Sequence, residues 1–83
     1  MGTKEKLIDR LKSKPKDFTF EELYTLLRLL GYRLDNAGKT SGSAIRFVRG
    51  SRPIRFHKPH PRNILKRYVI EYVIEELEKE GLL

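Results

Sequence analysis

Two histidines and a dense group of cations are the residues of this chain that could do chemistry. His57 and His60 are the only histidines among 83 residues, and imidazole is the side chain that exchanges protons near neutral pH. Both lie in the segment from Tyr32 to Arg67, which contains a single acid, Asp35, and ten lysines or arginines. The ten are Arg33, Lys39, Arg46, Arg49, Arg52, Arg55, Lys58, Arg62, Lys66 and Arg67. Such a density of positive charge favours a polyanionic ligand, and nucleic acid is the first candidate.

Metal-independent cleavage of RNA would use these two residue types together. The 2′-hydroxyl must lose a proton, the leaving 5′ oxygen must gain one, and cations must stabilise the phosphate oxygens. Histidine suits the proton transfers, so His57 and His60 are the candidate catalytic residues. Simpler interpretations stay open, in which His57 ends an exposed strand and His60 is a loop residue between two prolines. The nine cations assigned to nucleic-acid binding are Arg33, Lys39, Arg46, Arg49, Arg52, Arg55, Lys58, Lys66 and Arg67.

The composition restricts the other classes of function. Eighty-three residues make one small domain, residues 1–83, without room for a second core. Cysteine is absent, so thiol chemistry and cysteine-based zinc sites are excluded. His-Lys-Pro-His at residues 57–60 has no third ligand nearby, and we expect neither a metal nor a cofactor. The charged N-terminus resembles no signal peptide and no apolar run could span a membrane, so we expect a cytoplasmic protein without a membrane partner.

Three helices are predicted from apolar spacing and end signals. The first covers residues 3–14, is stopped by Pro15, and belongs to an N-terminal helical extension, residues 1–17. The second begins at Thr19, which forms a capping box with Glu22, and ends before Gly31. The third runs from about Pro61 or residue 63 to residue 81. Its broad apolar face exceeds what a small sheet needs, which raises the hypothesis of a homodimer.

Between the second and third helices the apolar pattern alternates with a period of two, which predicts three strands. They cover residues 32–35, 43–49 and 52–57, and Gly50-Ser51 would form a hairpin turn. In that register His57 faces Ala44, and Arg49 faces Arg52 with room for an anion between them. Arg33, Arg46, Arg55 and His57 would point to the side of the sheet away from the helices. Gly42 and Ser43 could form a small anion-binding loop before the second strand.

These elements predict an α+β domain of order ααβββα, in which helices cover one face of a three-stranded antiparallel sheet. The uncovered face would carry the arginines. Two other interpretations remain open: the cations could form a merely solvated face, and the tyrosines could pack in the core or stack on bases. The tyrosines are Tyr24, Tyr32, Tyr68 and Tyr72.

Residues 20–83 resemble the HicA family of toxin-antitoxin systems, which are small RNA-cleaving toxins. The resemblance consists of Leu30-Gly31-Tyr32, Gly42-Ser43-Ala44 followed by Ile45-Arg46-Phe47, a basic hairpin, a segment rich in histidine and proline, and Glu80-Gly81-Leu82. It implies a fold like that of double-stranded-RNA-binding domains and an endoribonuclease that acts on mRNA. It also implies an acidic protein partner, a HicB-like antitoxin.

One position departs from the family pattern. The family's tripeptide is usually Gly-Ser-His, whose histidine is implied to be catalytic, whereas this chain has Ala44 there. A methyl group cannot transfer a proton, so that role is not carried over. Three functions therefore remain open: an RNA-cleaving toxin that uses His57, a non-catalytic nucleic-acid-binding module, and a domain that binds an acidic protein.

Overall fold

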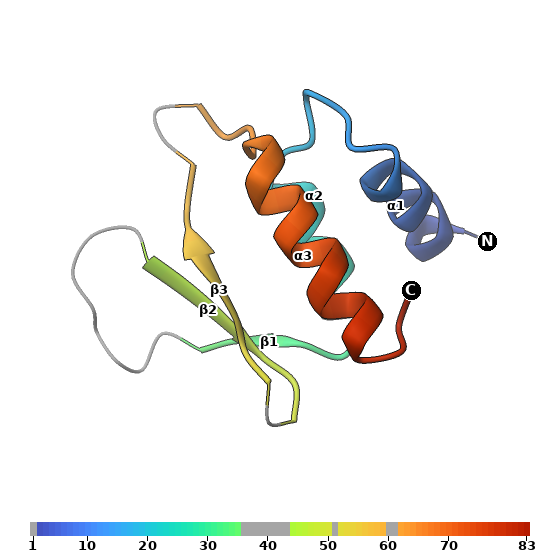
Figure 1. Ribbon diagram of the computed structural model, residues 1–83, viewed down its shortest axis with the longest axis vertical. Helices are drawn as coiled ribbons and strands as arrows, with labels where there is room; N and C mark the ends of the chain where they lie inside the picture. Colours follow the sequence, from blue (N-terminus) through green and yellow to red (C-terminus); the bar gives the residue numbers. More distant parts are fainter. Residues whose placement is uncertain (1, 36–43, 51, 60–61) are drawn as a thin grey trace.

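The computed structural model describes residues 2–35, 44–50, 52–59 and 62–83. The helices are α1 (Thr3–Lys12), α2 (Phe20–Leu29) and α3 (Arg67–Lys79), and the strands are β1 (Arg33–Leu34), β2 (Ala44–Val48) and β3 (Ile54–His57) (Figure 1). The order ααβββα is the predicted one. Four predicted site residues lie outside the described residues. They are Lys39, Gly42, Ser43 and His60.

The strands form an antiparallel meander in the order β1-β2-β3, so the α+β prediction is confirmed. The predicted register between β2 and β3 is also confirmed, because Ala44 lies opposite His57 and Arg46 lies opposite Arg55. β3 pairs with β2 alone in the sheet, so it is an edge strand, and Pro53 directly before it is tolerated at such an edge because proline has no backbone N–H to donate. Gly50 adopts a φ of +70°, as the turn after β2 requires.

One hydrophobic core lies between the sheet and the helices. Phe47 and Ile54 are fully buried on the inner side of the sheet, and Leu23, Leu26 and Leu27 of α2 are buried against the same core. Figure 1 shows α2 and α3 beside the sheet and α1 on their far side. α1 is therefore packed against α2 and α3 and contributes the fully buried Leu11. On α3, Ile70 is 1% exposed and Ile74 is partly buried against the same core. The homodimer stays a prediction.

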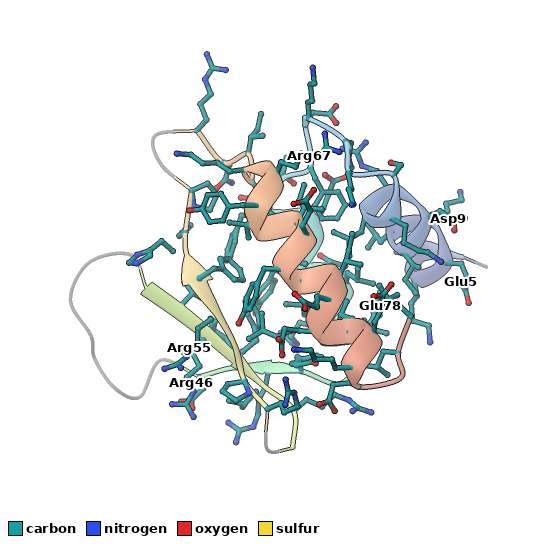
Figure 2. The ribbon with its side chains drawn as sticks, in the orientation of Figure 1. Glu5, Asp9, Arg46, Arg55, Arg67 and Glu78 are labelled. Atoms are coloured by element: carbon teal, nitrogen blue, oxygen red, sulfur yellow. The ribbon has the colours of Figure 1, made fainter. Side chains whose placement is uncertain are left out.

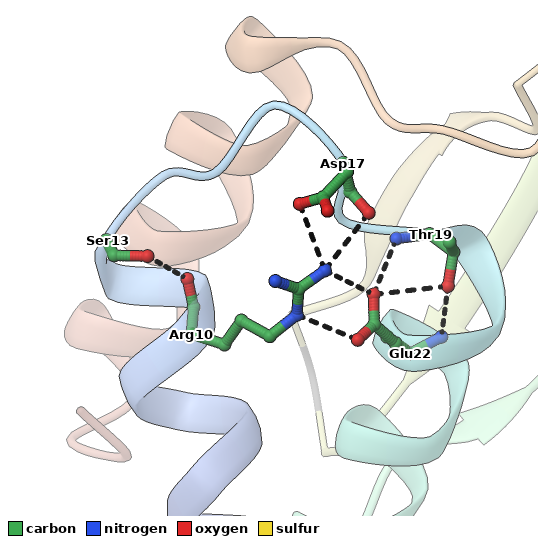
Figure 3. Close-up of polar contacts among 5 residues, drawn as sticks. All are labelled: Arg10, Ser13, Asp17, Thr19 and Glu22. Atoms are coloured by element: carbon green, nitrogen blue, oxygen red, sulfur yellow. Dashed lines mark hydrogen bonds and ion pairs between the residues drawn. The ribbon is translucent and has the colours of Figure 1, made fainter.

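A polar cluster joins α1 to the start of α2 (Figure 3). The predicted capping box is confirmed, with Thr19 Oγ1 accepting from the Glu22 backbone N–H at 3.1 Å and Glu22 accepting from the Thr19 N–H at 2.9 Å. Arg10 of α1 donates to both carboxylate oxygens of Glu22, at 2.8 and 3.1 Å, and to Asp17 Oδ1 at 3.1 Å. These hydrogen bonds from Arg10 are the main reason that the pKa of Glu22 is lowered.

The predicted start of the third helix was wrong. α3 begins at Arg67, because the residues before it pair with the chain that leads into α2. Phe20 donates its N–H to the Asn63 carbonyl at 2.9 Å, and Leu65 donates to the Phe18 carbonyl at 2.9 Å. An extended backbone satisfied in this way cannot make helical hydrogen bonds at the same positions. Leu65 is still buried, but from a short antiparallel bridge rather than from a helix.

The predicted end of the first helix was also wrong. α1 ends at Lys12 rather than residue 14, because Lys14 has a φ of +52°, outside the helical region. Leu34 lies opposite the buried Phe47, so it shares the inner face of the sheet, but it is 37% exposed. It belongs to the two-residue strand β1, which runs away from the helices (Figure 1).

Candidate nucleic-acid interface

The sheet presents a basic surface on the side away from the helices. Because residues opposite each other in an antiparallel pair share a face, the register places Arg33, Arg46, Arg55 and His57 together. All four side chains are exposed, whereas Ile54 and Phe56 alternate with them toward the core. We call these four residues the outer sheet face. Figure 2 shows Arg46 and Arg55 beside the sheet, with Glu5, Asp9 and Glu78 on the opposite side of the molecule.

The outer sheet face concentrates positive charge. Arg46 and Arg55 lie directly opposite each other, an arrangement of like charges that destabilises a sheet. One acid is nearby, since Asp35 Oδ2 lies 3.9 Å from Arg46 Nε. Within the described ranges, Arg33 and Arg55 make no ion pair. A phosphate between the strands would relieve the repulsion that remains between Arg46 and Arg55.

Arg49 and Arg52 belong to a different environment. Arg49 Nε donates to the Leu30 carbonyl at 3.0 Å, and its Nη1 lies 3.9 Å from Glu80. Arg52 lies 3.3 Å from Glu76 and 3.5 Å from Glu80. The negative charge expected between these two arginines is thus supplied by the carboxylates of Glu76 and Glu80. They lie on the helix side of the sheet, outside the outer sheet face, and have a structural role in holding the hairpin to α3.

The remaining predicted cations lie around the start of α3. Lys66 is the N-cap residue of α3 and is exposed. Arg67, in the first turn, pairs with Glu71 at 3.2 Å. Lys58 follows β3 and places its Nζ 5.2 Å from the centre of the Phe20 ring, a cation–π contact. These three residues are therefore separated from the outer sheet face by the end of β3.

A cationic cleft of about 440 Å³ opens beside His57, at the free edge of β3. Its charged walls are Lys16, Lys58, Arg62 and Lys66, and its other lining residues are His57, Pro59, Ile64, Leu65, Tyr68 and Val69. The described lining residues include no acid. Within the described part of the chain, none of the four cations has a carboxylate within 4 Å. His57 is thus the residue at which the outer sheet face and the cationic cleft meet.

Sequence reasoning missed two cations of this cleft, Lys16 and Arg62, as ligand-binding residues. Lys16 lies outside the basic segment that the sequence singled out, and acids are near it along the chain. It reaches the cleft because the chain at residues 18–20 pairs with the chain at residues 63–65. Tyr68, for which core packing and base stacking both remained open, is 69% exposed in the first turn of α3.

The site combines one described imidazole with several guanidinium and ammonium groups. Among the residues that the structure describes, no group of three or more His, Cys, Asp or Glu side chains could hold a metal ion. His57 lies opposite Ala44, the position at which the HicA pattern has its histidine. The register therefore places the His57 imidazole on the strand next to that of Ala44.

Comparison with known proteins found no match: no family model, no curated protein and no solved structure matches this chain. The resemblance to HicA toxins therefore stays a prediction. No described helix has the length and apolar character required to cross a membrane.

Proposed function

We propose that this protein binds RNA on the outer sheet face and cleaves it without a metal, as a HicA-like toxin. The observation that carries the proposal is the presence of Arg33, Arg46, Arg55 and His57 on one exposed side of the sheet. Guanidinium groups bind phosphate through paired hydrogen bonds, and RNA presents phosphates at regular spacing. The order α2-β1-β2-β3-α3 also supports a fold like that of double-stranded-RNA-binding domains, to which α1 is an addition.

In the proposed reaction His57 acts as the general base. Its neutral imidazole takes the proton of a ribose 2′-hydroxyl, whose oxygen attacks the adjacent phosphorus. The bond from phosphorus to the 5′ oxygen breaks, and that oxygen takes a proton from the imidazolium or from water. The products are a 2′,3′-cyclic phosphate and a free 5′-hydroxyl. Arg46 and Arg55 stabilise the negative charge on the phosphate oxygens during the attack.

The test compares the purified protein with His57→Ala, using a 5′-labelled RNA of mixed sequence in excess EDTA. General-base catalysis contributes roughly 100- to 10,000-fold to a rate, so we expect a loss of that size while the RNA affinity changes less than about threefold. A variant at an exposed helix residue, Lys4→Ala, is purified in parallel and controls for contaminating nuclease. Equal cleavage by all three proteins would refute the catalytic role of His57.

A second function, RNA binding without cleavage, is favoured by Ala44. If the usual catalytic histidine has been lost without replacement, the outer sheet face still binds phosphates but leaves the RNA intact. Tight, salt-sensitive binding with no cyclic-phosphate product would establish this function.

We also propose an acidic HicB-like antitoxin as the protein partner. Its carboxylates would pair with the arginines of the outer sheet face and exclude RNA from it. Co-expression with a short acidic reading frame next to the gene, followed by competition against labelled RNA, tests this partner. Failure of a bound partner to displace RNA would exclude the outer sheet face as its binding surface.

A further inference from the structure

Tyr68 is an unusually exposed aromatic residue for so small a protein. It lies in the first turn of α3 and is 69% exposed, whereas Tyr32 is 3% exposed and Tyr24 and Tyr72 are half-buried. Tyr72 is held in place by a hydrogen bond, because its hydroxyl accepts from the Arg55 backbone N–H at 3.1 Å. Tyr68 makes no such contact in the described part of the chain. Packing within the domain therefore does not account for its ring.

Tyr68 lies between two hollows of different character. One is the cationic cleft. The other, which we call the edge hollow, has a volume of about 360 Å³ and is mostly aromatic and apolar. The edge hollow is lined by Arg55, Phe56, His57, Tyr68, Val69 and Tyr72. His57, Tyr68 and Val69 line both hollows, so the free edge of β3 has an aromatic site and a cationic site side by side.

The two hollows match the two parts of a nucleotide. A base has apolar faces that stack on tyrosine, and a phosphate is neutralised by lysine and arginine. The cationic cleft brings together Lys16, Lys58, Arg62 and Lys66 without an acid, an arrangement in which like charges repel until an anion enters. Arg55 lines the edge hollow and also belongs to the outer sheet face, so the edge hollow is continuous with the outer sheet face.

We propose that the free edge of β3 binds one unpaired RNA nucleotide, with its base stacked on Tyr68 and its phosphate in the cationic cleft. This inference rests on the proposed function and adds the substrate class to it. The nucleotide must be unpaired, because the bases of a duplex are stacked on one another and do not offer their faces to a side chain. Such binding places a phosphodiester next to His57, so the substrate is single-stranded RNA rather than a duplex.

The experiment measures binding of a 12-nucleotide single-stranded RNA and of the same sequence as a blunt duplex, by fluorescence anisotropy. Stacking on an aromatic residue changes affinity roughly 5- to 150-fold, so we expect Tyr68→Leu to weaken single-strand binding within that range and to affect the duplex less. Tyr68→Phe keeps the ring and should bind like the unchanged protein. A 2-aminopurine base in the single strand should lose fluorescence on binding, and Tyr68→Leu should abolish that loss.

A second variant tests the phosphate site. Arg62→Ala removes one cation of the cationic cleft and should reduce the slope of log affinity against log salt by about 0.7 for single-stranded RNA. Circular dichroism of each variant establishes that it is folded.

The outcomes separate this inference from the proposed function. If the protein binds neither RNA, both are wrong. If it binds RNA with steep salt dependence but Tyr68→Leu changes single-strand affinity less than twofold, or if the duplex binds more tightly, only the inference is overturned.

Discussion

Arg52 and Arg55 provide a matched pair for testing whether the outer sheet face binds phosphate. They are the same residue type, three positions apart, but they lie on opposite sides of the sheet. Arg55 is exposed on the outer sheet face, and Arg52 pairs with Glu76 at 3.3 Å and with Glu80 at 3.5 Å. We predict that Arg55→Ala reduces the salt dependence of RNA binding and that Arg52→Ala does not.

The magnitude follows from counterion release. Each phosphate contact contributes about 0.7 to the slope of log affinity against log salt for a single strand. Between 50 and 200 mM salt, removing one contact therefore changes the ratio of the two affinities by about 2.6-fold. Arg52→Ala leaves the slope unchanged but lowers the urea midpoint of unfolding, because Glu76 and Glu80 lose a partner. Fluorescence anisotropy over a salt series, together with urea unfolding followed by circular dichroism, measures both effects.

The opposite result would refute the reasoning. If Arg52→Ala reduced the slope and Arg55→Ala did not, the RNA would bind on the helix side of the sheet. Equal changes in both variants would mean that binding follows total charge rather than a defined surface.

Two further predictions concern stability. Thr19→Ala removes the hydrogen bond that Thr19 Oγ1 accepts from the Glu22 backbone N–H, and it should lower the free energy of unfolding by about 0.5 to 2 kcal/mol. The control Thr25→Ala, at an exposed position within α2, should leave the free energy of unfolding unchanged or slightly raised. Equal losses of stability for the two variants in thermal unfolding would contradict the capping role of Thr19. The pKa of Glu22 is lowered in the folded protein by hydrogen bonds from Arg10, so its contribution is complete above the unfolded value of about 4.5 and is lost as the pH falls through the lower folded value. Between pH 7 and pH 3, Glu22→Gln should therefore lose less free energy of unfolding than the unchanged protein, as measured by urea unfolding at both pH values. Identical losses would refute the contribution of Glu22 ionisation to stability.

The charge distribution gives the molecule two different sides. The outer sheet face and the cationic cleft lie at the sheet and the start of α3, whereas acids follow along α3 toward its C-terminal end. Glu76 and Glu80 neutralise the inner arginines, and Glu71 neutralises Arg67. Of the described cations that make no ion pair with a carboxylate, Arg33 and Arg55 lie on the outer sheet face, and Lys16, Lys58, Arg62 and Lys66 line the cationic cleft. Lys4, Lys6, Lys12 and Arg28 lie on α1 and α2 instead.

The strand prediction succeeded where the pattern was local. Alternation of apolar and basic residues identified the inward positions Ile54 and Phe56 and the outward positions Arg55 and His57. The turn at Gly50 then determined the register, because a short turn leaves little freedom in how two strands pair. The capping box at Thr19 was equally visible, since its two residues are three positions apart.

The helix prediction failed where a distant segment competed. Apolar spacing from residue 63 onward satisfies the helical period, but Asn63 and Leu65 pair with the backbone near Phe18 and Phe20. No pattern within the third helix could reveal a partner more than forty residues away. The same limit applied to Arg49, whose carbonyl and carboxylate partners, Leu30 and Glu80, are both remote in sequence.

The sequence by itself determined the elements, their order and the side of the sheet on which the arginines lie, because periodicity and turn chemistry act between residues that are close along the chain. Only the tertiary structure decided which cations are available to a ligand. In the folded chain Arg49 pairs with Glu80 and Arg52 pairs with Glu76. Lys16 lines the same cleft as Lys58, Arg62 and Lys66. The physical reason is that hydrogen bonds and ion pairs form between neighbours in space, and in these cases those neighbours are far apart in sequence.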